Sequence, residues 1–449
     1  MRNILGLFLL VIGLHISAHA QYVSIPDSNF RIALQDIYPT CFNASNQLDT
    51  TCASILEATS LDIGNKNITS IEGVAYFRKL QVLFCNGNLL TTLAPLPDSL
   101  KRLYLNNNLL TALPAMPNTI QDLYCYGNQL VDLPSLPDSL QTVDFSVNHL
   151  TSLPSALPSK LKELYFTNNQ VSVLPALPNT LQTLDCSNNN ITALPSLPNT
   201  LHLLYCYANK LTVLPSLPNS ITWINCGINK LTSIPALPTS LEELDCYDNK
   251  ITTLPVLPNS LLYVLCDSNK LTVIPALPKF LLGLSFENNQ ITTLPALPNT
   301  LANLDAAHNK TLACLPPLPS TLINLYVKDT RITCFPNALV TGANIDTTLP
   351  ICVGQANVCI VATGIADNKN LAFKLFPNPT SNNITVELPY TGIGKWYLID
   401  ISGKTIQQNA IENNSRSFII NVNDIADGTY FLSVEMNGNV STSKVVVIR

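Results

Sequence analysis

The chain has few charged residues. Asp, Glu, Lys and Arg together make up 12% of the 449 residues, and the net charge is −5. Binding to nucleic acid or to an anionic membrane surface depends on a basic excess, which this chain does not have. We therefore expect neither partner.

The sequence also lacks the short motifs that carry common chemistry. It has no G-x-S-x-G, no H-E-x-x-H and no glycine-rich loop for phosphate, and outside the first twenty residues only His149, His202 and His308 occur, each isolated in its own coil. These gaps predict a protein that is not an enzyme, with no cofactor and no metal site.

Long apolar runs are missing except at the start of the chain. Arg2 precedes an apolar run from Ile4 to Ile16, and Ala18-His19-Ala20 forms a small-x-small cleavage site before Gln21. This arrangement predicts a secretory signal peptide over residues 1–20, because the run is too short to span a bilayer. We expect an exported chain with no transmembrane segment once the signal peptide is removed.

The dominant feature present is a repeat of twenty residues. The phrase L-x-x-L-x-C-x-x-N-x-[LI]-T-x-L-P-x-L-P-x-[ST] recurs, with one extra residue in one repeat, around these asparagines: Asn88, Asn108, Asn128, Asn148, Asn169, Asn189, Asn209, Asn229, Asn249, Asn269, Asn289 and Asn309. Alternation in L-x-x-L-x-C predicts a short strand with Leu and Cys inward, and the asparagine that follows can bond backbone groups of the turn. Proline excludes a helix from the L-P-x-L-P segment, so we expect extended chain there.

A fixed period with leucines at these offsets resembles the leucine-rich repeat, and the double L-P resembles its short bacterial class. The resemblance covers residues 61–335, about fourteen coils, with Lys66 and Thr330 at the asparagine place in the first and last coils. It implies a solenoid with a parallel β-sheet on the concave face and an extended convex side. Residues 21–60 would form an N-terminal helical cap, and residues 336–370 a C-terminal cap and linker.

Residues 371–449 change character to alternating strands separated by turn signals, which predicts a small all-β sandwich. The motif residues of this region are Pro377, Asn378, Pro379, Gly403, Lys404, Asp427, Gly428, Tyr430 and Lys444. With these sorting motif residues, the region resembles the type A C-terminal sorting domain of the type IX (Por) secretion system, and the opening Ile25–Phe30 resembles the start of secreted Bacteroidetes repeat proteins.

The sorting-domain resemblance implies Sec export to the periplasm and then passage across the outer membrane, with the type IX machinery as partner. It further implies a product that is attached to the cell surface or released after cleavage of the domain. The alternative is an accessory β domain that binds something else.

The cysteines form two populations. Seven occupy the inward strand position, where Leu105, Phe145, Phe166 and Phe286 stand in other coils, so we expect buried free thiols rather than a metal ladder or a run of disulfides. The other six lie in the flanking regions of an exported chain, where disulfides are favoured. Proximity in sequence pairs Cys41 with Cys52 and Cys352 with Cys359, and a bond between Cys314 and Cys334 would join the last two coils.

Outward strand positions are rich in aromatic residues, which combine apolar area with a polar tip and suit recognition of proteins and sugars alike. The candidate ligand-binding residues on the concave face are Tyr104, Tyr124, Tyr126, Tyr165, Tyr205, Tyr207, Trp223, Tyr247 and Tyr263. We expect a secreted or surface-attached protein that recognises a protein or glycan through this face. The alternative is a structural surface-layer component without a discrete ligand, whose aromatic residues only fit exposed strand surface.

Overall fold

The computed structural model describes residues 22–337, 344–345, 349–352, 373–400, 404–413, 415–436 and 439–448. The signal peptide expected over residues 1–20, Gly403 and Cys359 lie outside these residues. The chain divides into two compact units, residues 1–359 and 360–449, which are described separately.

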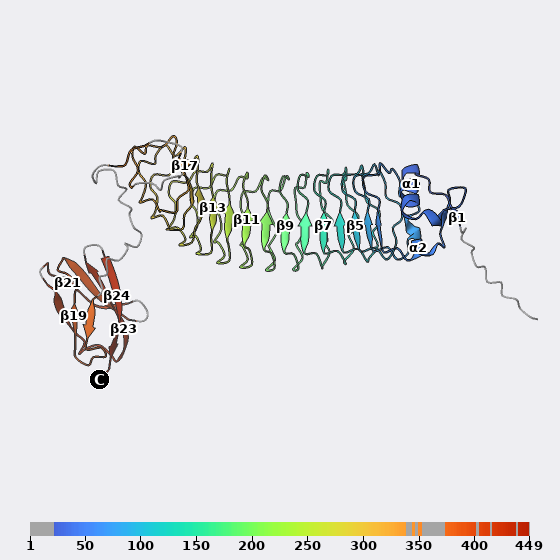
Figure 1. The fold of residues 1–449 in the computed structure, drawn as a ribbon. Helices are drawn as coiled ribbons and strands as arrows, with labels where there is room; N and C mark the ends of the chain where they lie inside the picture. Colours follow the sequence, from blue (N-terminus) through green and yellow to red (C-terminus); the bar gives the residue numbers. More distant parts are fainter. Residues whose placement is uncertain are drawn as a thin grey trace, which may run out of the picture. The chain divides into compact units, whose positions relative to one another are not determined.

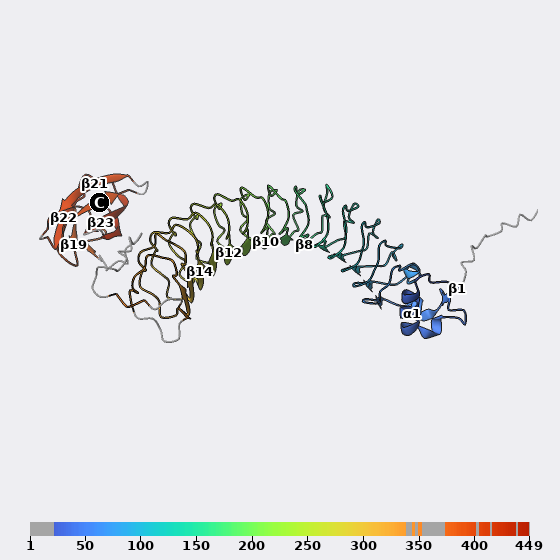
Figure 2. The same cartoon turned by 90° about the horizontal axis from the view of Figure 1, so that it is seen from above.

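The first unit is a stack of coils on one parallel sheet, in which each strand pairs with the strand of the next coil in chain order. Figure 2 places the strands along the concave side of the stack. The strands of three residues are β3 (Ser60–Asp62), β4 (Val82–Phe84), β5 (Arg102–Tyr104), β6 (Asp122–Tyr124), β7 (Thr142–Asp144), β8 (Glu163–Tyr165), β9 (Thr183–Asp185), β10 (Leu203–Tyr205), β11 (Trp223–Asn225), β12 (Glu243–Asp245), β13 (Tyr263–Leu265), β14 (Gly283–Ser285), β15 (Asn303–Asp305) and β16 (Asn324–Tyr326).

A fifteenth, shorter strand, β17 (Asn344–Ile345), extends the sheet beyond β16. The middle residue of each three-residue strand is buried, as are the Leu, Ile or Cys residues at the other inward offsets of the repeat. The L-P segments on the opposite side have no regular secondary structure. The solenoid of about fourteen coils expected from the twenty-residue period is thus confirmed.

A ladder of buried asparagines ties the coils together. The Asn189 Nδ2 group donates to the carbonyls of Phe166, Cys186 and Ser187 at 2.9, 3.2 and 3.0 Å, and its Oδ1 atom accepts from the Val171 amide at 3.0 Å. One side chain therefore bonds backbone groups of its own coil and of the preceding coil. The same pattern recurs from Asn88 to Asn309.

The residue before each ladder asparagine has left-handed backbone geometry. Where this residue is not glycine, φ lies between 48° and 56° in the coils from Asn107 to His308. Glycine and asparagine adopt this geometry at little cost, which accounts for the N-N and G-N pairs of the repeat. Val147 and Ile228 are β-branched and are strained at this position.

Hydroxyl groups form a second ladder at the end of the repeat. Thr200 Oγ1 donates to the Leu181 carbonyl at 2.7 Å, and Ser220 Oγ donates to the Leu201 carbonyl at 2.6 Å. Between the two ladders lie seven buried free thiols, as expected: Cys85, Cys125, Cys186, Cys206, Cys226, Cys246 and Cys266. Burial raises the pKa of the Cys186 thiol far above its usual range, so the group is held as an unreactive thiol.

The N-terminal end is closed by a cap of short elements: β1 (Tyr22–Val23), α1 (Ser28–Ile37), η1 (Pro39–Cys41), β2 (Leu48–Asp49) and α2 (Ala53–Leu56), with η2 (Val74–Tyr76) following in the first coil. They lie at one end of the stack in Figure 1. Asp27 caps α1 through the Phe30 amide at 2.8 Å, and its other oxygen accepts from the Thr69 amide at 2.7 Å. Partial burial raises the pKa of Asp27, but hydrogen bonds outweigh it and leave the pKa lowered.

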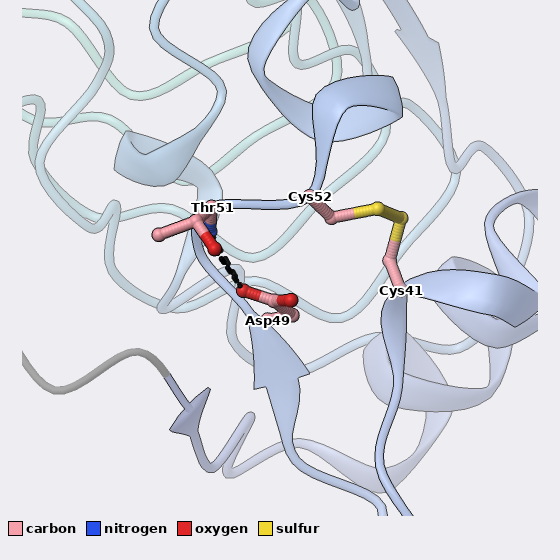
Figure 3. The surroundings of a disulfide bond; sticks show 4 residues. All are labelled: Cys41, Asp49, Thr51 and Cys52. Carbon is pink, nitrogen blue, oxygen red and sulfur yellow. Dashed lines mark hydrogen bonds between the residues drawn. A yellow bond between two sulfur atoms is a disulfide. The ribbon is translucent and has the colours of Figure 1, made fainter.

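A disulfide closes the loop between η1 and α2. Cys41 and Cys52 are bonded with their Cα atoms 5.5 Å apart, as the sequence predicted. Figure 3 shows this bond beside Thr51, whose hydroxyl donates to the Asp49 carboxylate at 2.7 Å. The bond links the end of the capping helix region to the entry of the first coil.

The predicted pairing of the C-terminal cysteines is wrong. Cys334 bonds to Cys352, with Cα atoms 5.0 Å apart, and not to Cys314. The reason is local backbone pairing: the Phe335 amide donates to Pro350 and the Cys352 amide donates to Phe335, each at 2.8 Å, so the chain returns beside residue 334. Cys314 is also disulfide-bonded, whereas Cys359, predicted to pair with Cys352, lies outside the described residues.

The second unit consists of two antiparallel sheets. One contains β18 (Lys374–Phe376), β19 (Asn383–Glu387) and β22 (Ser417–Asn421); the other contains β20 (Gly394–Ile399), β21 (Thr405–Ile411), β23 (Gly428–Met436) and β24 (Asn439–Val447). Residues of both sheets share one core that includes Ile384, Ile420, Trp396 and Leu432. The predicted small β-sandwich is confirmed. Across the described parts of both units, no helix is long and apolar enough to cross a membrane.

The asparagine ladder gives a sharp test of what holds the coils in register. Substitution Asn189→Ala should lower the free energy of unfolding by about 1–3 kcal/mol, because it leaves buried backbone carbonyls and an amide without partners. The matched control is Asn190→Ala, the same substitution at the next residue, whose side chain is only half-buried and outside the ladder. Chemical denaturation of both variants measures the effect. Equal losses for the two would contradict the ladder's role.

Candidate ligand-binding face

The N-terminal part of the concave sheet carries a stack of aromatic rings. Phe84 and Tyr104 have ring centroids 4.5 Å apart and an interplanar angle of 14°, and Tyr104 and Tyr124 follow at 4.9 Å and 4°. All three side chains are half-buried. Because the ring faces cover one another, this part offers a ligand mainly ring edges and hydroxyl groups, and the stacking also stabilises neighbouring coils.

The central part of the face presents rings differently. Tyr207 and Tyr247 are two coils apart, yet their ring centroids lie 6.4 Å from each other. The coil between them carries Gly227, and a Cβ atom at this position would lie 2.5 Å from the Tyr247 ring. Because Gly227 has no side chain, the Tyr247 ring packs over it, in what we call a glycine notch, and approaches the Tyr207 ring across the intervening coil.

A second glycine notch lies in the neighbouring coils. Tyr263 leans over Gly283 of the next coil, where a Cβ atom would lie 2.8 Å from the ring. Tyr263 and Trp223 are each 37% exposed although they sit on strands of the sheet. The centre of the face therefore combines exposed aromatic area with glycine notches, a shape suited to a ligand with flat apolar faces.

The nine aromatic residues predicted from the sequence all lie on this side of the sheet, in three positions of the coil. Tyr104, Tyr124, Tyr165 and Tyr205 end their strands, Trp223 and Tyr263 begin theirs, and Tyr126, Tyr207 and Tyr247 follow two residues after a strand. The rings of Tyr104 and Tyr124, and of Tyr207 and Tyr247, are brought together.

Carboxylates were not predicted as site residues, although they occupy the same outward positions. Burial raises the pKa of Asp245 to about 6, and the nearby Asp267 adds to the shift. Burial also raises the pKa of Asp185 and Asp267. The Ser285 hydroxyl and the Glu287 amide, at 2.7 Å, donate to Asp267. The strand alternation that identified the tyrosines could have identified these acids.

The tyrosine hydroxyls share this environment. Burial raises the pKa of Tyr165 to about 12, aided by the neighbouring Glu163 carboxylate, whose Oε2 atom accepts from the Tyr165 hydroxyl at 3.4 Å. The hydroxyl is therefore a neutral hydrogen-bond donor at physiological pH. Within the residues that the structure describes, no group of three His, Cys, Asp or Glu could hold a metal ion. The face offers stacking and hydrogen bonding.

In the second unit, hydrogen bonds of the sorting motif residue Asn378 connect the start of the domain to its last strand, β24. The Asn378 Nδ2 group donates to the Lys444 carbonyl at 2.7 Å and its Oδ1 accepts from the Val446 amide at 2.8 Å, so Pro377-Asn378-Pro379 is bound to β24. The Tyr430 hydroxyl donates to the Ala426 carbonyl at 2.8 Å across the Asp427-Gly428 turn. Lys404 is exposed, and its amide donates to the Asp400 carboxylate at 3.1 Å.

Two family models match the chain. Residues 374–448 match the secretion system C-terminal sorting domain, and residues 159–199 match the Leucine Rich repeats (2 copies). No curated protein matches. The sorting-domain match implies export and a secreted or cell-surface location.

Solved structures agree on the solenoid. YopM from Yersinia enterocolitica is 33% identical, with a TM-score of 0.56, over 65% of this chain and 71% of its own. YopM from Yersinia pestis, a leucine-rich effector protein, is 30% identical, with a TM-score of 0.55, over 64% of this chain and 88% of its own. The functional domain of InlJ from Listeria monocytogenes, which includes a cysteine ladder, shows the same fold at 22% identity and a TM-score of 0.57, covering 95% and 99% of the two chains.

The raised pKa of Asp245 predicts a pH effect on stability. Its folded pKa of about 6 lies above the unfolded value, so ionisation disfavours the folded state and stability falls as the pH rises from about 4 to 6. Asp245→Asn should therefore raise the free energy of unfolding by roughly 1 kcal/mol at pH 7.5, with the gain disappearing near pH 4.

Thermal melts across this pH range check the prediction. Glu242→Gln is the control, since Glu242 lies exposed in the same coil and loss of its carboxylate should give no comparable pH-dependent gain. An equal gain in the control, or an Asp245 variant that is less stable at every pH, would contradict the account.

Proposed function

We propose that this chain, which belongs to the leucine-rich repeat family and carries a secretion system C-terminal sorting domain, is an exported recognition protein. It would bind a protein or glycan through the concave face. Binding would centre on Tyr205, Tyr207, Trp223 and Tyr247. The proposal includes no catalytic step.

The approach of Tyr207 and Tyr247 across Gly227 is the observation that carries this proposal. Aromatic side chains on a solenoid can be explained by packing where their ring faces cover one another, as at Phe84, Tyr104 and Tyr124. The central group instead has a notch opened by glycine, and Trp223 beside it is 37% exposed. Binding hot spots are enriched in exposed aromatic side chains of this kind.

The second candidate is a structural surface-layer component without a discrete ligand. The continuous N-terminal ring stack favours it, because stacking between coils stabilises the solenoid without any partner. The two candidates differ in what removal of the central aromatic residues should change: ligand capture for the first, and only the integrity of the protein or its assembly for the second.

Replacing Tyr205, Tyr207, Trp223 and Tyr247 together by Ala should weaken binding by about 2 kcal/mol or more while changing the melting temperature little, because the rings lie outside the core. The mature chain from residue 21 would be screened on glycan and protein arrays, and isotherms for the best hit compared with melting curves of the same preparations. A fall in melting temperature with unchanged binding would favour the structural candidate.

Gly227→Ala sharpens this test because it removes no aromatic ring. Ser187 and Ala307 occupy the equivalent position in other coils, so the backbone accepts a side chain there. The new methyl group displaces the Tyr247 ring and should weaken binding in the same direction as the quadruple substitution.

Export through the type IX pathway forms a second part of the proposal. We infer that the C-terminal unit directs outer-membrane passage after Sec transport, that the type IX machinery binds it, and that the solenoid then stays on the surface or is released. The separation of the chain into two compact units supports independent sorting and binding roles.

Truncation before Phe376 should leave a folded solenoid that accumulates in the periplasm, because the sorting unit is lost and the solenoid core is intact. Cell fractionation and protease protection locate the product, with the full-length chain as control. Surface display of the truncated protein at the full-length level would rule out this sorting role.

A further inference from the structure

A row of lysines runs along the flank of the solenoid next to the asparagine ladder. Lys210, Lys230, Lys250 and Lys270 each follow a ladder asparagine in four consecutive coils, and all four are exposed. We call these four residues the lysine row. Gln290 occupies the position in the next coil, and Lys310 in the one after.

The backbone holds the lysine row in register. The amide of each lysine donates to a carbonyl of the preceding coil: Lys210 to Ile191 at 2.9 Å, Lys230 to Leu211 at 2.8 Å, Lys250 to Leu231 at 2.8 Å and Lys270 to Ile251 at 2.9 Å. Adjacent lysines are thus one coil spacing apart, ~4.8 Å at the backbone, and the row extends ~14 Å.

Among the residues that the structure describes, no carboxylate forms an ion pair with the lysine row. Lys79 with Glu57 and Arg102 with Asp122 are ion pairs elsewhere on the solenoid. The acids of these coils nearest in sequence are Asp248, which is exposed, and Asp267, which already accepts hydrogen bonds from Ser285 and Glu287. Four neighbouring cations without partners repel one another, a cost that an anionic partner would remove.

The fold does not require lysine at this position. Leu109, Gln129, His149 and Asn190 occupy it in earlier coils, because only the backbone is used in the ladder. Two residues after each lysine stands an exposed threonine, Thr212, Thr232, Thr252 or Thr272, with a buried Leu or Ile between them. Since lysine and threonine alternate with inward residues, ammonium and hydroxyl groups line the same flank.

We propose that the lysine row and its threonines bind a linear anionic polysaccharide that runs along the stack, with carboxylate groups on the ammoniums and sugar hydroxyls on the threonines. An extended acidic glycan presents its charges in a line, as the row does. Duplex nucleic acid carries one charge per ~1.7 Å, and the row contains no aromatic ring for base stacking. This site is separate from the concave aromatic face.

The test uses polygalacturonate as the probe and its methyl-esterified form as the uncharged control. The full mature chain should bind polygalacturonate at low salt, and binding should weaken as NaCl is raised because exposed charges are screened. It should not bind the methyl ester. The variant K210Q/K230Q/K250Q/K270Q should bind at least tenfold more weakly; Gln290 shows that the position accepts glutamine.

The charge-matched control is K66Q/K101Q/K160Q/K162Q, which removes four exposed lysines elsewhere on the solenoid. It should retain binding within about twofold, a spread typical of surface substitutions remote from a site. Equal losses in the two variants, full binding in the first, or undiminished binding of the ester would overturn the proposal. Duplex DNA bound as tightly as polygalacturonate, and lost in the same variant, would overturn the assignment to a glycan.

Discussion

The register between coils depends on the buried asparagine ladder. Each ladder side chain satisfies backbone groups of two successive coils, so neighbouring coils cannot slide without leaving buried carbonyls and amides unpaired. The twenty-residue period follows from this constraint, as does the left-handed residue that precedes each asparagine. Every outward position is thereby aligned with its equivalents in the coils on either side.

Alignment makes the surface of this protein a set of straight rows whose chemistry can vary without affecting the core. Inward positions accept Leu, Cys or Phe, provided that the volume is filled. Outward positions differ along the stack: stacked rings near the N-terminal end, notched aromatic residues and acids at the centre, and the lysine row on one flank. Stability therefore depends on the inward residues, and the proposed recognition on the outward ones.

Local sequence patterns were enough to predict the solenoid and its buried thiols, from the repeat, and also the Cys41–Cys52 bond and the C-terminal sandwich, because each depends on local alternation or short separations. The Cys334–Cys352 bond could not be predicted, since it depends on the chain returning beside residue 334 after leaving the repeat. The approach of Tyr207 to Tyr247 could not be predicted either. It depends on the absence of a side chain at Gly227 in the coil between them, so it involves three successive coils and cannot be read from a single repeat.

The central claim is that the notched aromatic residues, and not the solenoid as a whole, contact the ligand. Hydroxyl-radical footprinting with mass spectrometry, on the mature chain with and without the best array hit, tests this most directly. The account predicts protection of Tyr207, Trp223 and Tyr247, with no change at exposed convex residues such as Val256, which is 86% exposed. Protection confined to the convex side, or equal oxidation of the three aromatic residues in both states, would contradict it.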